Sequence, residues 1–397
     1  MASGAAAMAL RESFGDRKIP EISRKITACV ACRKLKNEVS GKLFTSSYTF
    51  DDVRALCVGT LWLPEVSKAL NGLAVRIATE LDLHRSITKM PHTKRACYDR
   101  TRLYFLVYLS DHHCFLTHGK PPLTRDFHSL KSPRAFLESR FSSPSDMILI
   151  SQVELWSINS QVFDTFGADT DNCVDSHKLA QISCLEDSYK QCRGYWLGTM
   201  DFDTRDHFAG RMFDFYFHSA KFYLFSHVFR GQSELSTEAL RDVEHYALRA
   251  LEHALSIVCF VSCETRECLQ QLPYYIGAVT AFASVCLVKA SSQKRDIICN
   301  KEGEDIITHL HRLVQVLHPP PGETQSSHPL LGIAKGLDTA MHSAGAHQFD
   351  HNQHSLPDFN GLFEFDFALD GLDIFNVDST ELSTAGTTGT FPLSERE

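Results

Sequence analysis

The sequence predicts an all-α protein whose main part is a multi-helical domain. Apolar residues recur every three to four positions in segments between residues 53 and 317, which is the period of a helix with one buried face. Prolines and glycines end several of these segments, and no series of alternating apolar and polar residues indicates a sheet. With 397 residues, 43% of them hydrophobic, the chain is long enough to bury a substantial core.

The first two predicted helices form an early pair. Residues 49–52, Thr-Phe-Asp-Asp, supply N-cap candidates, and helically spaced apolar residues then run from Val53 to Leu61. Pro64 ends this helix because proline cannot continue the backbone hydrogen bonds. A second helix follows over residues 70–81, with charged residues opposite its apolar face.

A strongly apolar third helix is predicted from about Tyr98 to Phe115, and we expect it at the centre of the core. Residues 119–122, Gly-Lys-Pro-Pro, end it. The same periodicity predicts further helices over residues 146–166, 208–229, 237–261, 274–290 and 305–317. The last of these ends before residues 319–322, Pro-Pro-Pro-Gly, after which the composition changes to Gly, Ser, Thr, His and acidic residues.

Charge is distributed unevenly along the chain. Residues 17–42 carry a net charge of +6, residues 336–397 carry −10, and the 335 residues before this acidic tail are close to neutral at +2. We therefore divide the chain into a disordered start (1–16), a basic head (17–47), a helical body (48–320), a linker (321–355) and an acidic-aromatic segment (356–397).

Composition also bears on the compartment of the protein. Thirteen cysteines are an odd number and lack the dense, even spacing of a disulfide-stapled secreted fold, so we expect a reducing compartment. No run of eighteen apolar residues and no secretory signal pattern occurs, so neither a membrane partner nor secretion is expected.

The basic head contains a pair of cysteines with the spacing of metal ligands. Cys29 and Cys32 are followed by Arg33, Lys34 and Lys36, so two thiolates and a cationic turn lie side by side. Thiolates three residues apart can bind one metal ion while the cations face phosphate oxygens. Two incidental cysteines in a basic arm remain the alternative, whereas a redox dithiol would require a preceding strand that the sequence does not predict.

This segment resembles the first half of the fungal binuclear zinc cluster, a six-cysteine DNA-binding module, whose opening pattern Ala-Cys-x-x-Cys-Arg-x-x-Lys matches residues 28–36. The resemblance implies that Cys29 and Cys32 ligate zinc and that Arg33, Lys34 and Lys36 contact promoter DNA. The family's third cysteine position is Val39 here, so two of six ligands are present. Structural zinc supplies roughly 10–16 kcal/mol to the folding of such modules. With two ligands the head is therefore expected to stay unfolded. The missing cysteines have two explanations: the sequence lacks part of the module, or a truncated form acts through partners.

The body resembles the middle homology region of the same family of fungal transcription factors. Residues 73–85 match its Ala-x-Arg-x-Ala helix, residues 100–104 its arginine-rich helix start, and residues 119–123 its Gly-Arg-Pro-Pro segment, with Asp82 in place of the usual Gly and Lys120 in place of the usual Arg. Within the family, the sequence of this region is most similar to activators of secreted-protease genes.

The resemblance implies a nuclear activator of genes for secreted proteases and protein utilisation, which is not an enzyme. It also implies a homodimer, although residues 37–48 contain no heptad repeat for a coiled coil. The alternative is an interaction protein that does not bind DNA and modulates a full-length relative or a coactivator. We find no Gly-rich phosphate loop, nucleophile elbow or His-Glu-x-x-His helix in support of an enzyme.

Several polar residues of the body have simpler structural interpretations. Arg76 and Glu80 are expected to form a surface pair, and His84 to lie at a helix C-terminus. His112 and His113 project about 100° apart on a helix and cannot chelate one ion together, so they are expected to pack or to line a rim. For the group Cys259, Cys263 and Cys268 we favour core thiols over a metal site. A small-molecule pocket in the body remains open, with no residues that identify it.

The acidic tail contains a segment of alternating bulky apolar and acidic residues from Leu362 to Phe375. Charge repulsion and two glycines disfavour an isolated helix, which leaves the apolar side chains available to a transcriptional coactivator. These partner-binding candidates are Leu362, Phe363, Phe365, Phe367, Leu369, Leu372 and Phe375. Burying three of them supplies roughly 4–9 kcal/mol, against roughly 2–5 kcal/mol for ordering the segment. The alternative is a C-terminal strand or helix that docks on the body.

Overall fold

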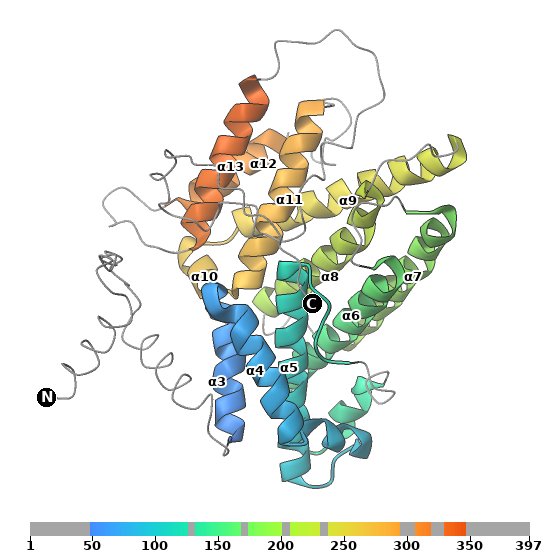
Figure 1. Ribbon diagram of the computed structural model, residues 1–397, viewed down its shortest axis with the longest axis vertical. Coiled ribbons are helices and arrows are strands. Elements are labelled where there is room, and N and C mark those ends of the chain that lie inside the picture. Colours follow the sequence, from blue (N-terminus) through green and yellow to red (C-terminus); the bar gives the residue numbers. More distant parts are fainter. Residues whose placement is uncertain are drawn as a thin grey trace, which may run out of the picture. The chain divides into compact units, whose positions relative to one another are not determined.

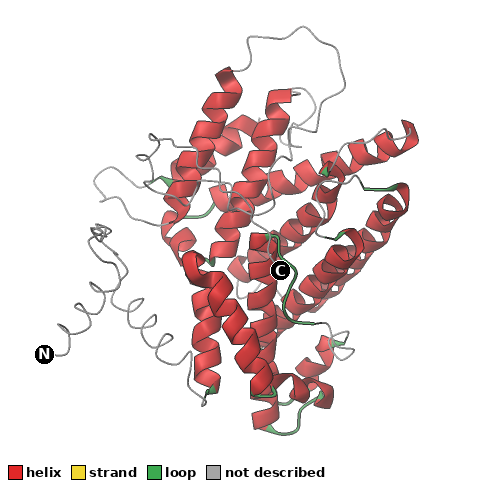
Figure 2. Cartoon of the chain, viewed as in Figure 1, coloured by secondary structure: helices red, strands yellow, loops and turns green. Residues whose placement is uncertain are grey.

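The computed structural model describes residues 48–125, 132–167, 174–200, 207–230, 237–293, 306–318 and 329–346. Within these ranges the chain forms α-helices, short 3-10 helices and loops, and no strand (Figure 2). The all-α prediction is therefore confirmed for the described residues. The chain divides between Tyr48 and Thr49 into two units, and every helix named below belongs to the second unit.

The α-helices succeed one another along the chain as labelled in Figure 1. They are α3 (Phe50–Trp62), α4 (Ser67–Glu80), α5 (Arg95–His118), α6 (Pro144–Phe166), α7 (Ser176–Thr199), α8 (His207–Ser226), α9 (Thr237–Ser262), α10 (Arg266–Gln271), α11 (Tyr274–Gln293), α12 (Ile306–Leu317) and α13 (Pro329–Ala346). The 3-10 helices are η1 (Pro64–Val66), η2 (Leu83–Lys89), η4 (Pro133–Glu138) and η5 (His227–Phe229).

The body begins with a helix whose start is set by its own residues. The Thr49 hydroxyl accepts a hydrogen bond from the Asp52 backbone N–H, and the Asp52 carboxylate accepts one from the Thr49 N–H at 2.8 Å, which completes a capping box. The N-cap expected from the sequence is thus confirmed. Pro64 opens η1 and separates α3 from α4, as predicted.

The first three helices pack against one another (Figure 1), and α5 also packs on α6 and α11. α4 buries the apolar face expected for it, including Leu70, Ala74 and Ile77. α5 runs one turn beyond the predicted range at each end and is buried on most of its surface. It ends at Gly119, whose φ of 59° is the left-handed conformation that glycine adopts at low cost.

A second layer of helices continues from α5 through α6, α7 and α8 to α9. α6 packs on α5, α7 and α8, and α8 packs most extensively on α9. Trp156 of α6 and Trp196 of α7 are fully buried, as is Phe225 of α8. Large aromatic side chains therefore supply much of the apolar area that holds this layer together.

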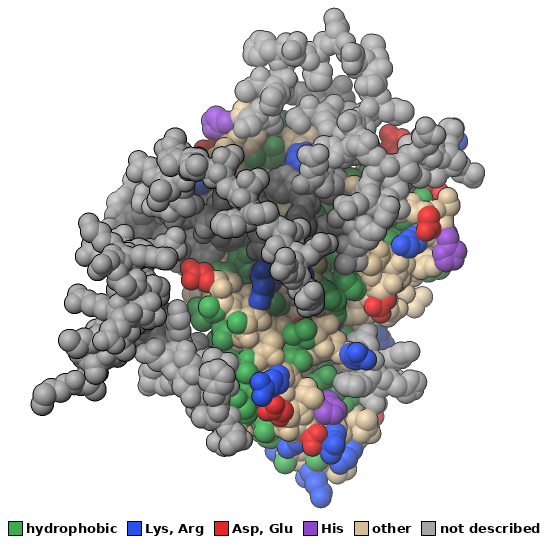
Figure 3. All heavy atoms as spheres, viewed as in Figure 1, with side chains coloured by type: hydrophobic (Ala, Val, Ile, Leu, Met, Phe, Trp, Pro, Cys, Tyr) green, Lys and Arg blue, Asp and Glu red, His purple; other side chains and the backbone are tan. Residues whose placement is uncertain are grey.

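α11 joins this layer to α12 and α13, against both of which it packs. Its window Tyr274–Ser291 is apolar and long enough to cross a membrane by composition, but 67% of that window is buried inside the protein. Burial by neighbouring helices is what a central core helix requires, and composition alone does not separate the two cases. On the face drawn in Figure 3, charged side chains of both signs are interspersed with apolar ones.

Three α-helices were not anticipated: α7, α13 and the six-residue α10. α7 buries Leu179, Ile182 and Trp196 at helical spacing, but Glu186 lies on the same face and weakens the contrast between apolar and polar sides. α13 lies inside the stretch 321–355 expected to be a linker, so that expectation is wrong for residues 329–346. Ile333, Ala334 and Leu337 pack the helix into the body despite the glycines around them.

Candidate regulatory site in the helical body

The residues that the sequence singled out for DNA, metal and coactivator binding lie outside the described residues. This holds for the head residues Cys29, Cys32, Arg33, Lys34 and Lys36. It holds equally for the tail residues Leu362, Phe363, Phe365, Phe367, Leu369, Leu372 and Phe375. These assignments stay predictions, and the described part of the chain informs us about the helical body.

The first family-like motif ends at a residue with unusual backbone geometry. Asp82 follows the C-cap of α4 with φ 55° and ψ 31°, in the left-handed region. Glycine adopts this conformation without a steric penalty, which explains physically why a glycine is usual at this place in the motif. Arg76 and Glu80 form the expected exposed pair, with Nε and Oε1 2.9 Å apart.

The second motif ties the start of α5 to its neighbours. The Arg100 guanidinium donates to the Leu81 carbonyl at the end of α4 and lies 5.3 Å from the ring centroid of Phe50 at the start of α3. His84 lies within η2, near the ring of Tyr104, rather than at an α-helix C-terminus. The motif residues of this region therefore connect the three helices α3, α4 and α5.

The third motif is held by a buried carboxylate. Asp111 of α5 is 1% exposed, and it accepts hydrogen bonds from the Asn71 amide at 2.7 Å and from the backbone N–H and hydroxyl of Thr124, each at 2.6 Å. These bonds draw the segment after Gly119 back over α4 and α5. The three motifs thus belong to one packed unit, and much of their pattern has a structural explanation.

His112 and His113 are both core residues. The His112 ring bonds through Nδ1 to the Tyr108 carbonyl and through Nε2 to the Ser160 hydroxyl, each at 2.8 Å. His113 stacks on Tyr275 with ring centroids 4.4 Å apart, and burial lowers its pKa to about 3. The expectation that these side chains pack is confirmed, whereas a place on a rim is wrong because both are buried.

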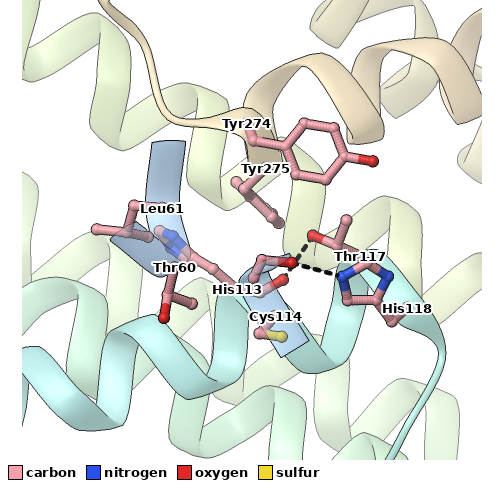
Figure 4. A pocket seen from close by; sticks show the side chains of 9 residues that line it. Thr60, Leu61, His113, Cys114, Thr117, His118, Tyr274 and Tyr275 are labelled. Atoms are coloured by element: carbon pink, nitrogen blue, oxygen red, sulfur yellow. Dashed lines mark hydrogen bonds between the residues drawn. The ribbon is translucent and has the colours of Figure 1, made fainter. Parts of the chain in front are cut away.

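His113 also lines a small pocket where α3, α4, α5 and the start of α11 meet (Figure 4). The other lining residues are Thr60, Leu61, Ser67, Cys114, Thr117, His118, Tyr274 and Tyr275. The hydroxyls of Thr60 and Thr117 donate to carbonyls one turn earlier in their own helices, and the Ser67 hydroxyl lies 3.0 Å from Nε2 of His118.

The size of this pocket limits what it can bind. Its free volume is about 10 Å³, close to the space that one water molecule needs. Burial and the neighbouring Asp111 raise the pKa of the Cys114 thiol to about 11, so this thiol is protonated at neutral pH. In the conformation described, the pocket is water-sized and has no room for a metabolite.

A larger polar arrangement lies where α7, α8 and α9 meet, and we call Glu186, Lys221 and Arg249 the charge cluster. Oε1 of Glu186 lies 2.7 Å from Nζ of Lys221 and 2.8 Å from Nη2 of Arg249. Burial alone would raise the pKa of Glu186, but its bonds to the two cations outweigh burial and hold the pKa at about 2. Both cations also lie over the ring of Phe225.

A histidine pair extends the charge cluster along the same interface. Nδ1 of His218 on α8 lies 2.8 Å from Nδ1 of His253 on α9, and His253 stacks on Phe225. Burial lowers the pKa of His253 to about 2 and that of His218 to about 4. The cations nearby act in the same direction, whereas the Asp214 carboxylate opposes the shift of the His218 pKa. At neutral pH the pair is uncharged, and one ring donates a hydrogen bond to the other.

Sequence reasoning missed the charge cluster and misplaced the three cysteines near the end of α9. Cys259 and Cys268 are partly exposed and Cys263 is exposed, so the prediction of core thiols is wrong for this group. The reason is that α9 ends at Ser262, which places Cys263 beyond the helix. No group of three or more His, Cys, Asp or Glu side chains that could hold a metal ion occurs among the residues that the structure describes.

Comparison with known proteins supports the resemblance seen in the motifs. The chain is 29% identical over 335 residues to the transcriptional activator of proteases prtT of Emericella nidulans. The alignment covers 81% of this chain and 50% of the relative, so the chain spans about half the length of that protein. No protein-family model and no solved structure matches the chain.

Proposed function

We propose that this protein is a nuclear transcription regulator that activates genes for secreted proteases and for protein utilisation. The observation that carries the proposal is the similarity to a transcriptional activator of proteases over 81% of the chain, a share that must include most of the helical body. The common packing of the three motif segments around α5 supports it, because the residues that carry the resemblance form one structural unit.

In this proposal the three parts of the chain have separate tasks. The basic head directs the protein to promoter DNA, the helical body provides a regulatory domain, and the acidic tail recruits a coactivator. The apolar residues between Leu362 and Phe375 would bind the coactivator weakly and reversibly, since the roughly 4–9 kcal/mol from burying three of them is offset by roughly 2–5 kcal/mol of ordering. Catalysis has no part in it.

The residues present do not fit the zinc cluster that the family implies. Cys29 and Cys32 provide two thiolates, whereas one zinc ion takes four ligands and the family's paired ions share six cysteines. The proposal therefore gives zinc no part in DNA binding, and Arg33, Lys34 and Lys36 contact DNA phosphates from the head.

This misfit supports the second candidate, an interaction protein that does not bind DNA itself. Such a protein would act through its helical body on a full-length relative, or through its tail on a coactivator. The two candidates make opposite predictions in a cell that already contains a protease activator, because a partner that lacks DNA binding competes with the activator instead of replacing it.

Complementation in a fungal host tests both candidates. In a host deleted for its own protease activator, production of this chain is expected to restore extracellular protease, and a triple Phe363→Ala, Phe365→Ala, Phe367→Ala variant is expected to lose most of that effect. Leu382→Ala, outside the alternating segment, is the matched control. Reduced protease in an undeleted host, with no restoration in the deleted one, would favour the interaction protein. No effect in either host would overturn the proposal.

A second assay separates the tail from the head. Residues 336–397 fused to an unrelated DNA-binding domain are expected to activate a reporter gene, and the triple phenylalanine variant is expected to abolish activation. Lack of activation by the unmodified fusion would contradict the role given to the tail. Zinc content of the purified full chain, measured by atomic spectroscopy and compared with that of a Cys29→Ser, Cys32→Ser variant, would show whether the two cysteines of the head retain the metal.

A further inference from the structure

A thiol and an imidazole that are fifty residues apart in the sequence meet between α9 and α12. Sγ of Cys259 lies 3.5 Å from Nδ1 of His309, within the range of a hydrogen bond to sulfur. In the tautomer whose Nδ1 carries no proton, the thiol donates to the ring. A cysteine and a histidine in hydrogen-bond contact form the pair that activates thiols, because the imidazole can take the thiol proton and stabilise the thiolate.

Exposure makes this pair different from the three buried thiols of the described body. His309 is 5% exposed and is therefore held by the packing of α12, while Cys259 is partly exposed and can be reached by a small molecule. Cys57, Cys192 and Cys286 are buried, and burial raises the pKa of each thiol to about 12. Those three are unreactive by comparison.

A second thiol lies one helical turn away. The backbone N–H of Cys263 donates to the carbonyls of Cys259 and Phe260, both at 3.2 Å, so the last turn of α9 tightens at this point. The side chain of Cys263 is exposed. Helix neighbours four residues apart have Cβ atoms about 5–6 Å apart, whereas a disulfide needs about 3.5–4.5 Å. Closing the bond requires a small rearrangement at the helix end, where the chain leaves α9.

We propose that Cys259 is an oxidation site that His309 activates, and that Cys263 resolves the oxidised form to a disulfide. The oxidant is a hydroperoxide. The Cys259 thiolate attacks the outer peroxide oxygen, the O–O bond breaks, and the leaving alkoxide or hydroxide takes the proton held by His309. Cys259 becomes a sulfenic acid, and the peroxide is reduced to an alcohol or water. The Cys263 thiol then attacks the sulfenic sulfur, and water leaves with the formation of the disulfide.

Oxidation would change the contact between α9 and α12. In the reduced protein the Cys259 thiol forms a hydrogen bond with His309. In the disulfide this hydrogen bond is lost, and Cys259 is joined covalently to Cys263 at the end of the same helix. α12 loses a polar contact that holds it to α9, and the last turn of α9 changes conformation. A thiol reductant reverses the disulfide, so the site is suited to a reversible response in a reducing compartment.

Peptide mass spectrometry of the intact full-length protein tests the site. The reduced protein is treated with hydrogen peroxide, sulfenic acids are trapped with dimedone, and each cysteine peptide is quantified over time. Cys184 of α7, which is exposed, serves as the internal reference. Cys259 is expected to react about tenfold faster than Cys184, as for a thiol whose thiolate fraction is raised about tenfold by a cationic neighbour. A Cys259–Cys263 disulfide is then expected to accumulate.

Variants separate activation from simple exposure. His309→Gln removes the base and is expected to lower the rate at Cys259 to that at Cys184, while His311→Gln, on the exposed side of the same helix, leaves it unchanged. Cys263→Ser is expected to replace the disulfide with trapped sulfenic acid on Cys259. Equal rates at Cys259 and Cys184 in the unmodified protein would overturn the proposal whether or not the His309 variant folds, and persistence of sulfenic acid without a disulfide would overturn the role of Cys263.

Discussion

Replacement of Glu186 by glutamine tests whether the charge cluster holds α7, α8 and α9 together. The change removes one negative charge that Lys221, Arg249 and, at 3.3 Å on the exposed side, Lys190 share. The side chains of Glu186 and Lys221 are only 8% and 4% exposed. Removing one partner of a buried ion pair leaves an uncompensated charge and costs about 3–5 kcal/mol in free energy of unfolding. Because Glu186 also bonds to Arg249, we expect a loss at the upper end of that range.

Removing a cation of the cluster, Lys221, is expected to lower the free energy of unfolding less than removing the carboxylate of Glu186. Lys221→Met keeps the aliphatic stem against the neighbouring phenylalanines and leaves Glu186 paired with Arg249 at 2.8 Å. The double variant Glu186→Gln, Lys221→Met then has one buried cation fewer than Glu186→Gln alone, so its stability should exceed that of the single variant. This ordering is a stronger test than any single magnitude, because general damage to the core would make the two losses add.

Urea denaturation followed by circular dichroism and by tryptophan fluorescence measures these differences. Asp187→Asn is the matched control, since Asp187 is the next residue of α7, is exposed, and pairs with Lys190 at 3.3 Å. Lys190 lies equally far from Glu186, so the control leaves that exposed lysine with its partner in the cluster. Its expected cost is below about 0.5 kcal/mol. A loss of less than about 1 kcal/mol for Glu186→Gln, far below the range for a broken buried pair, would refute the reasoning, as would additive losses in the double variant.

Three further predictions concern the motif region and the buried histidines. Asp82→Gly is expected to raise the free energy of unfolding by up to about 1 kcal/mol because it relieves a left-handed backbone, whereas Asp82→Ala, which keeps a Cβ, should not; thermal denaturation compares them. Asp111→Asn weakens charge-assisted bonds worth about 1.5–3 kcal/mol each, so backbone amides near Thr124 should exchange faster with deuterium. The pKa values of His113 and His253 are lowered in the folded state to about 3 and about 2, so below pH 6.5 the unfolded chain binds protons that the folded protein does not. Stability should therefore fall as pH drops from about 6.5, by at most about 1.4 kcal/mol per pH unit for each histidine, and His113→Phe should flatten a urea midpoint plotted against pH.

Local signals in the sequence predicted most helices because each helix carries its own pattern. Thr49 and Asp52 mark the start of α3 by side-chain chemistry that acts within four residues, and Gly119 marks the end of α5 in the same way. The spacing of apolar residues predicted where α4, α6, α8 and α9 lie. α13 was not predicted because its buried residues are few and its glycines are typical of a linker.

The charge cluster could not be predicted because it depends on partners that are distant in the sequence. Lys221 lies inside a helix that is apolar on almost every side, between Ala220 and Phe222, and this is a signal that a buried partner exists. Nothing local indicates that the partner is Glu186, 35 residues earlier, on a helix whose pattern is itself weak. The meeting of Cys259 with His309 is hidden for the same reason, since it requires α12 to pack on α9.

The capping of α3 bears on the choice between the two candidate functions. The backbone N–H groups of Thr49 and Asp52 are each satisfied by the other residue's side chain, and the division of the chain into two units falls directly before Thr49. The start of the body therefore has a capping box built from its own residues. Loss of zinc ligands from the head would then leave the fold of the body intact, and a chain unable to bind DNA would still present the helical surfaces through which it acts on a partner. A purified fragment that begins at Tyr48 should accordingly unfold with the same urea midpoint as the full chain, and a lower midpoint would show that the body depends on the head after all.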